Sequence, residues 1–132
     1  MKVVDASVGF KWLVPEQDSD KAIALQAEEL HAPDFFPVEV TNAIHVSELR
    51  GRVVDAQLLL DDLLPQMPIL HSSADLLTRA LEIATQFRRT IYDSLYVALA
   101  EREQCELVTA DQRLLNTLRA HFSFIVALSS LP

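Results

Sequence analysis

The sequence MKVVD, residues Met1–Asp5, is a short apolar run with two adjacent valines that ends on a carboxylate. A similar run, ELVT at Glu106–Thr109, is followed by Ala110 and Asp111. Short β-branched runs of this kind, bounded by polar residues, are typical of buried strands. We therefore expect two strands that each deliver an aspartate at or just past the carboxyl end.

Three further strands and seven helices are expected in the rest of the chain. The strand candidates are Ala32–Phe35, Ile69–His71 and Phe124–Leu128. Elsewhere apolar residues recur at three- and four-residue spacing, which is typical of amphipathic helices. These helices are predicted at Ser7–Val14, Asp18–Leu30, Pro37–Arg50, Val54–Leu64, Ser73–Phe87, Ile91–Arg102 and Asp111–His121. Short strands alternating with helices predict an α/β fold, with a parallel sheet of about five short strands that helices cover on both faces.

The composition is that of one globular domain. The chain has 132 residues, of which 50% are hydrophobic and only two are glycine, and no repeat or linker divides it. We expect residues 1–132 to form a single domain. The one cysteine, Cys105, excludes an internal disulfide. No stretch resembles a signal peptide or approaches the roughly 20 apolar residues that a membrane span needs, so a cytoplasmic protein without a membrane span is predicted.

The charge balance is strongly acidic. Nineteen acidic residues against eleven basic residues give a formal net charge of −8. This excess argues against broad electrostatic binding to nucleic acid, for which a basic surface is expected. A site built of carboxylates nevertheless attracts phosphate once divalent cations occupy it. An acidic chain also suits a basic protein partner.

Four acidic residues fall where one edge of the predicted sheet would gather them. Asp5 closes the first strand, and Asp111 lies just past the fourth. Glu39 is in the first turn of the helix that begins at Pro37. The helix of Asp93 must run antiparallel to the strand that follows it, so its first turn returns to the same edge. Ligands of open α/β sheets bind outside the carboxyl ends of the strands, and carboxylate oxygens select hard ions such as Mg²⁺ or Mn²⁺.

Each of these acids also has a purely structural explanation. Thr90 and Asp93 match a Thr-x-x-Asp capping box, and Asp111 fits a simple N-cap. Glu39 complements the positive end of its helix. Asp5 is harder to explain in this way, because a charged residue at the end of a buried strand needs a partner or a metal. The convergence of all four acids on one edge favours a metal site.

Four segments resemble the acidic motifs of PIN-domain proteins, and all four occur in order. They are VVDASVGFKWL from Val3, PVEVTNAI from Pro37, TIYDSLYVALAE from Thr90 and LVTADQRL from Leu107. Within that family the sequence is most similar to the VapC-type toxins of bacterial and archaeal toxin–antitoxin pairs. The resemblance implies a PIN-like three-layer sandwich. It also implies an acidic metal site of Asp5, Glu39, Asp93 and Asp111, supported by Ser7, Asn42 and Thr109.

The activity that this resemblance implies is magnesium-dependent hydrolysis of RNA phosphodiester bonds, with Mn²⁺ as a possible substitute. A metal held by carboxylates lowers the pKa of a bound water and generates hydroxide for attack on the phosphorus. Asp5 and Asp93 are the expected primary ligands, and the two other acids complete the site. The residues proposed to contact RNA phosphates are Lys11, Arg88, Arg89 and Arg113, for which a solvated surface position is the alternative.

Other chemistries fit the residues less well. An aspartate-based phosphatase would carry a second aspartate two residues after Asp5, where this chain has Ser7. A receiver domain would need an acidic pair after the first strand and a lysine after the last. The four histidines are scattered, so a histidine-based ribonuclease has little support. A catalytically silent PIN-fold binding module, which acts only through protein partners, remains open.

The segment Phe36–Leu64 holds more apolar residues than one face of each helix needs. They are Val38, Val40, Ile44, Val46, Leu49, Val53, Leu58, Leu59, Leu60 and Leu63. We expect some of them to line an interface, in a homodimer that also binds a segment of a cognate antitoxin in a groove. An arginine or lysine of that segment would reach the acidic edge and compete with Mg²⁺. The alternative is that all of these residues pack inside one subunit.

Overall fold

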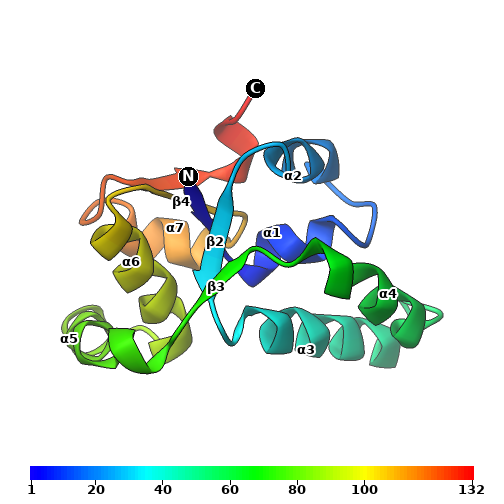
Figure 1. Cartoon of the computed structure of the whole chain (residues 1–132), viewed down its shortest axis with the longest axis horizontal. Helices are drawn as coiled ribbons and strands as arrows, with labels where there is room; N and C mark the ends of the chain where they lie inside the picture. The colour runs from blue at the N-terminus through cyan, green and yellow to red at the C-terminus, as the bar shows by residue number, and fades with distance from the viewer.

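Five short parallel strands form one sheet with the order β3-β2-β1-β4-β5 (Figure 1). The strands are β1 (Lys2–Val4), β2 (Leu30–Pro33), β3 (Ile69–His71), β4 (Glu106–Thr109) and β5 (Ile125–Ala127). The computed structural model describes all 132 residues. Because every pair of neighbouring strands is parallel, the five carboxyl ends lie along one edge of the sheet.

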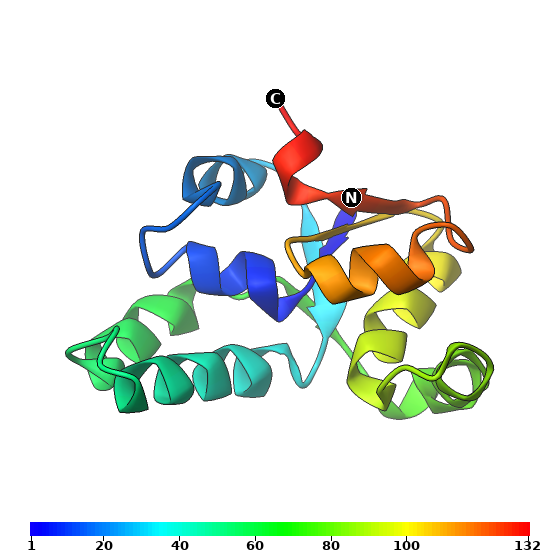
Figure 2. The ribbon, with the colours of Figure 1, turned by 180° about the vertical axis from the view of Figure 1, so that it is seen from behind.

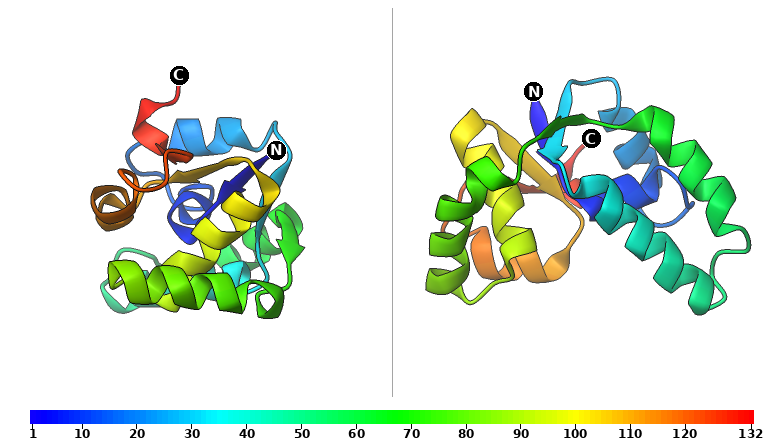
Figure 3. Two further views of the ribbon diagram at one scale, coloured as in Figure 1. Left: turned by 90° about the vertical axis from the view of Figure 1, so that its left-hand side faces the viewer. Right: turned by 60° about the horizontal axis from the view of Figure 1, so that its bottom comes forward.

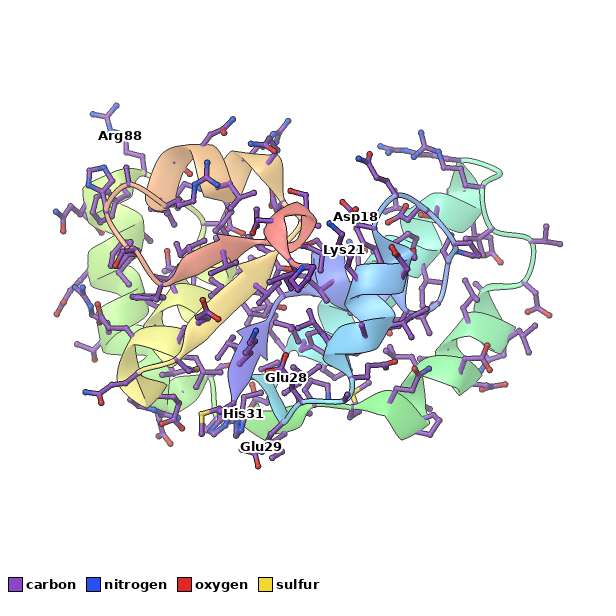
Figure 4. The ribbon with its side chains drawn as sticks, turned by 90° about the horizontal axis from the view of Figure 1, so that it is seen from above. Asp18, Lys21, Glu28, Glu29, His31 and Arg88 are labelled. Carbon is purple, nitrogen blue, oxygen red and sulfur yellow. The ribbon has the colours of Figure 1, made fainter.

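Seven helices cover the two faces of this sheet, as the α/β prediction requires. They are α1 (Ala6–Lys11), α2 (Ser19–Leu25), α3 (Phe36–Leu49), α4 (Ala56–Leu63), α5 (Leu77–Phe87), α6 (Ile91–Glu103) and α7 (Gln112–Leu118). Short 3-10 turns occur at η1 (Leu64–Gln66), η2 (Ala74–Leu76) and η3 (Leu128–Ser130). Helices α5, α6 and α7 lie on one side of the sheet, and α1 to α4 lie on the other (Figures 2 and 4). No helix is long and apolar enough to cross a membrane.

The hydrophobic core occupies both faces of the sheet, and α6 is its most deeply buried helix. Helix α6 packs against β1, β2 and β4, and α5 packs against its outer side. For this reason every residue from Ser94 to Ala100 is buried, and α6 has no polar face in its middle. The hydrophobic cluster contains 31 buried residues, which is enough to hold the edge of the sheet rigidly.

Helices α3 and α4 form an arm that reaches beyond the sheet (Figure 3, right). The arm is attached where α3 packs against α1. At that contact, a Cβ on Gly9 would lie only 2.5 Å from Cζ of Phe36, whose ring is fully buried. Glycine is therefore required for α1 to approach α3 this closely, and the approach brings the residue before α1 near the first turn of α3.

The predicted elements all occur, but several predicted boundaries were wrong, most clearly the boundary between α2 and β2. Helix α2 ends at Leu25, five residues before the predicted end at Leu30, and β2 begins at Leu30 rather than at Ala32. The four β2 residues are buried because β2 is paired on both sides, with β1 and β3. Helical spacing that continued into a strand concealed this turn. The predicted helix Ser73–Phe87 is also divided, into η2 and α5.

Candidate functional site

The four predicted carboxylates line one cavity of about 410 Å³ at the carboxyl edge of the sheet. Asp5 is the N-cap of α1 and directly follows β1. Asp111 is the N-cap of α7 and is separated from β4 by one residue. Glu39 and Asp93 lie in the first turns of α3 and α6. The positive N-terminal ends of helices therefore point toward the cavity, and they offset part of the repulsion among the carboxylates.

Asp5 is held by a network that joins the ends of β1 and β4. The hydroxyls of Ser7 and Thr109 both donate to its carboxylate, and the amide of Val8 donates at 3.3 Å. Ser7 Oγ in turn accepts from the amide of Ala110 at 2.9 Å. The pKa of Asp5 is raised to about 7, chiefly by burial and to a smaller extent by the charge of Asp111, while the hydrogen bonds from the two hydroxyls oppose the shift. A cation in the cavity would offset the energetic cost of burying the ionised Asp5 carboxylate.

Glu39 is held from the opposite side by a tyrosine. The hydroxyl of Tyr96 donates to Oε1 of Glu39 at 2.9 Å, and the ring of Tyr96 is buried in the core. Burial raises the pKa of Glu39, and the charges of Asp93 and Asp111 act in the same direction. Glu39 is therefore close enough to Asp93 and Asp111 for their negative charges to act on it.

Tyr96 is a site residue that the sequence assigned only to packing. Two features of the sequence could have identified it. It lies three residues after Asp93, so the two side chains share one face of α6. A buried tyrosine hydroxyl also needs a hydrogen-bond partner, and an acidic site offers one.

Asp93 differs from Asp5 because it already has a cationic partner. Nη2 of Arg89 donates to Oδ2 of Asp93 at 2.6 Å, and both side chains are more than four-fifths buried. Nε of Arg89 is buried without a hydrogen-bond partner. Thr90 caps α6 by accepting from the amide of Asp93 at 3.1 Å. Half of the expected capping box is therefore present, and the carboxylate half is used for Arg89 instead.

Asp111 does what its structural explanation predicts. Its Oδ1 accepts from the amides of Arg113 at 2.9 Å and Leu114 at 3.4 Å, at the start of α7. It nevertheless lines the cavity with the other three acids. The capping role and a position at the acidic edge are thus compatible.

The donor set of the cavity is suited to a hard cation that keeps its water. In this arrangement no three His, Cys, Asp or Glu side chains form a group that could hold one ion. An all-protein cage is therefore absent. Mg²⁺ is usually bound by one or two carboxylates together with several waters, and oxygen donors in a cavity of this volume fit that mode of binding.

Residues 2–119 match the model of the PIN domain. The chain belongs to the PIN-domain family. Ribonuclease VapC3 of Pyrobaculum aerophilum is 38% identical over 118 residues, or 85% of this chain and 90% of that protein. Ribonuclease VapC9 of Mycobacterium tuberculosis is 34% identical over 122 residues, or 91% and 93% of the two chains. The crystal structure of PAE2754 from Pyrobaculum aerophilum matches with a TM-score of 0.73 at 25% identity, over 98% and 91% of the two chains. The resemblance drawn from the four motifs is confirmed.

The basic residues predicted near the PIN-domain motifs are only partly at the cavity. Lys11 lines it, but its Nζ is engaged by Glu16 Oε1 at 3.0 Å and by the carbonyl of Gln17 at 2.7 Å. Arg88 takes a left-handed conformation at the end of α5 and points outward from the molecule (Figure 4). Arg113 is exposed on α7 and does not line the cavity. Asn42, one turn after Glu39, does line it.

Two histidines that look unrelated in the sequence form a pair outside this PIN-domain cavity. Nδ1 of His31 and Nε2 of His71 are 2.7 Å apart, and Nε2 of His31 lies 2.7 Å from Oε1 of Glu29. Figure 4 shows the side chains of Glu29 and His31 together at β2. Burial and the neighbouring His31 lower the pKa of His71. The pair links β2 to the edge strand β3, so two histidines that lie 40 residues apart in the sequence come together in a structural contact.

Proposed function

We propose that the protein is a metal-dependent ribonuclease that hydrolyses RNA phosphodiester bonds at the acidic cavity, with Mg²⁺ or Mn²⁺ as cofactor. The observation that carries the proposal is the convergence of Asp5, Glu39, Asp93 and Asp111 on one cavity. The names of the relatives support it, since two proteins that are 34% and 38% identical are called ribonucleases. Family membership alone would not be sufficient, because function depends on the site rather than on the fold.

In this mechanism the residues of the chain have separate tasks. Asp5 and Asp93 would hold the cation, and Asp111 and Glu39 would complete its surroundings. Ser7 and Thr109 hold the Asp5 carboxylate in place by hydrogen bonds to its two oxygens. A bound divalent cation supplies Lewis acidity and a water of lowered pKa.

Proton transfer in the cavity is also assigned to these side chains. The Asp5 carboxyl has a pKa of about 7, and a cation beside it would favour its ionised form. Tyr96 fixes Glu39 through Oε1, and Oε2 has no protein hydrogen bond. That free oxygen can accept a hydrogen bond from a water molecule and orient this water toward the phosphate. It can then take up the proton that the water loses.

We further propose that the chain is the toxin of a type II toxin–antitoxin pair and forms a homodimer. The proposal follows the VapC names of the relatives and the apolar residues of the α3–α4 arm. Val40, Ile44, Val53 and Leu63 are buried within the subunit, whereas Val38, Leu49 and Leu58 are exposed. The remaining three, Val46, Leu59 and Leu60, are half-buried. The segment thus packs inside one subunit in part, and its exposed remainder is available to a partner.

A cleavage assay with matched variants tests the nuclease. RNA should be cleaved with Mg²⁺, left intact with a chelator, and left intact by Asp5→Asn. The control is Asp20→Asn, an exposed carboxylate on α2 that should retain full activity. Mg²⁺ should also raise the melting temperature of the wild type and leave that of Asp5→Asn less affected. A wild type that folds, binds a partner and cleaves no RNA with Mg²⁺ or Mn²⁺ would favour the binding-module alternative.

A further inference from the structure

A second, mainly apolar cavity of about 340 Å³ adjoins the acidic one. Phe35, Val38, Glu39, Asn42 and Tyr92 line it, and Glu39 and Asn42 line both cavities. It lies where the first turn of α3 faces the first turn of α6. A polymer whose phosphate enters the acidic cavity would therefore place a neighbouring group in the apolar one.

Tyr92 is the one aromatic residue of the chain whose side chain is mostly exposed, and it immediately precedes Asp93. Its ring packs on Phe35 at a centroid distance of 5.5 Å, and Phe35 packs edge-on against Tyr96 at 5.1 Å. The ring is thus supported from behind by the core, while 59% of the residue remains exposed. No hydrogen bond holds its hydroxyl to the rest of the protein.

We infer that this cavity, the Tyr92 subsite, binds an unpaired nucleobase next to the scissile phosphate, an inference that rests on the proposed ribonuclease function. The Tyr92 ring provides a stacking surface, and Val38 provides an apolar wall. The Asn42 amide can donate to and accept from the edge of a base. Glu39 is the only charged residue in the lining, so the subsite suits an uncharged ring rather than a phosphate. Unstacked bases of single-stranded RNA are commonly bound in this way.

Kinetics with matched variants test the subsite. A cleaved oligonucleotide is first recovered from a random-sequence single-stranded RNA pool by sequencing the product ends. Tyr92→Ala should raise KM for that oligonucleotide by about 5- to 100-fold, and Tyr92→Phe should preserve it. Leu81→Ala is the control, because Leu81 is also 59% exposed and lies on α5 away from both cavities. Its KM should equal that of the wild type.

Abasic substitutions identify the nucleotide that occupies the subsite. At one position beside the cleaved bond, removal of the base should raise KM for the wild type and have little further effect on Tyr92→Ala. An unchanged KM for Tyr92→Ala, or full additivity at every position, overturns the inference while the nuclease stands. Loss of dimer or of antitoxin binding with an unchanged KM assigns the surface to a protein partner and also overturns it. A wild type that cleaves nothing with Mg²⁺ would instead overturn the proposed function.

Discussion

The two sides of the acidic cavity have opposite electrostatic states. On the β1–β4 side, Asp5 is surrounded by hydroxyls and has no cationic partner, and its pKa is about 7. On the α6 side, Asp93 is paired with Arg89. A cation bound between them would gain most from Asp5 and would have to compete for Asp93. Four acids at one edge are thus not equivalent ligands, and their differences can be measured.

The largest effect is expected for the two residues proposed as primary ligands. Asp5→Asn and Asp93→Asn should each reduce cleavage by at least about 100-fold, because each removes a charged cation ligand. Their effects on the metal-free fold should have opposite signs. Asp5→Asn relieves a buried carboxylate and should raise the melting temperature above pH 7. Asp93→Asn leaves the Arg89 guanidinium buried without its partner and should cost about 1–3 kcal/mol.

Calorimetric melting of the two variants in chelator measures this contrast. Equal shifts of the melting temperature with the same sign in both variants would mean that the Arg89–Asp93 pair does not stabilise the fold. Asp20→Asn again serves as the control for a carboxylate lost from the surface.

The pH dependence of stability should identify Asp5 specifically. Because its pKa rises from 3.8 in the unfolded chain to about 7, the folded state holds a proton that the unfolded state releases. The stabilising contribution of that proton is full below about pH 4 and is lost as the pH rises through about 7, with a slope of at most about 1.4 kcal/mol per pH unit.

The readout is the difference between wild type and Asp5→Asn, measured without metal from pH 5 to pH 8. His71 acts in the opposite direction, since its pKa is lowered and its contribution is lost as the pH falls below about 6.5. Both proteins contain His71, so its effect cancels in the difference. A difference that stays constant with pH would contradict the raised pKa of Asp5.

Removal of Arg89 should strengthen cation binding. Arg89→Gln leaves Asp93 free and increases the negative charge of the cavity, so the affinity for Mg²⁺ should rise about fivefold, on the order of 1 kcal/mol. Titration calorimetry measures it. Arg79→Gln is the matched control, because Arg79 on α5 pairs with Glu82 on α5 and Glu101 on α6, and none of the three lines the acidic cavity. Unchanged or weaker Mg²⁺ binding in Arg89→Gln would mean that Arg89 does not oppose the metal.

The sequence predicted the fold and the position of four acids at one edge of the sheet because both follow from local rules. Apolar runs specify the strands, and parallel topology brings their carboxyl ends to one edge. It failed at Leu30, where helical spacing continued into a strand that only pairing on both sides defines.

The residues that contact the four acids were harder to predict than the positions of the acids themselves. Arg89 was expected to contact RNA phosphates, but it contacts Asp93 at i,i+4. Tyr96 reaches Glu39 across 57 residues of sequence. The Arg89–Asp93 pair could have been predicted from its i,i+4 spacing. The Tyr96–Glu39 contact depends on tertiary packing, which spacing along one helix does not contain. The exposure of Tyr92, two residues before the buried stretch Ser94–Ala100 of the same helix, also depends on tertiary packing.

The most indirect effect is expected for Tyr96, which acts through Glu39. Tyr96→Phe removes the hydroxyl that donates to Oε1 and keeps the ring that packs in the core. Because this hydrogen bond lowers the pKa of Glu39, its loss should raise that pKa and move the acid limb of the kcat profile to higher pH. We expect kcat to fall by about tenfold with little change in KM, as for other residues that orient a ligand. A purely structural role would lower the melting temperature and leave the acid limb where it is in the wild type. Tyr96→Phe with a normal profile and a normal kcat would therefore remove Tyr96 from the site and leave Glu39 to be oriented by the cation alone.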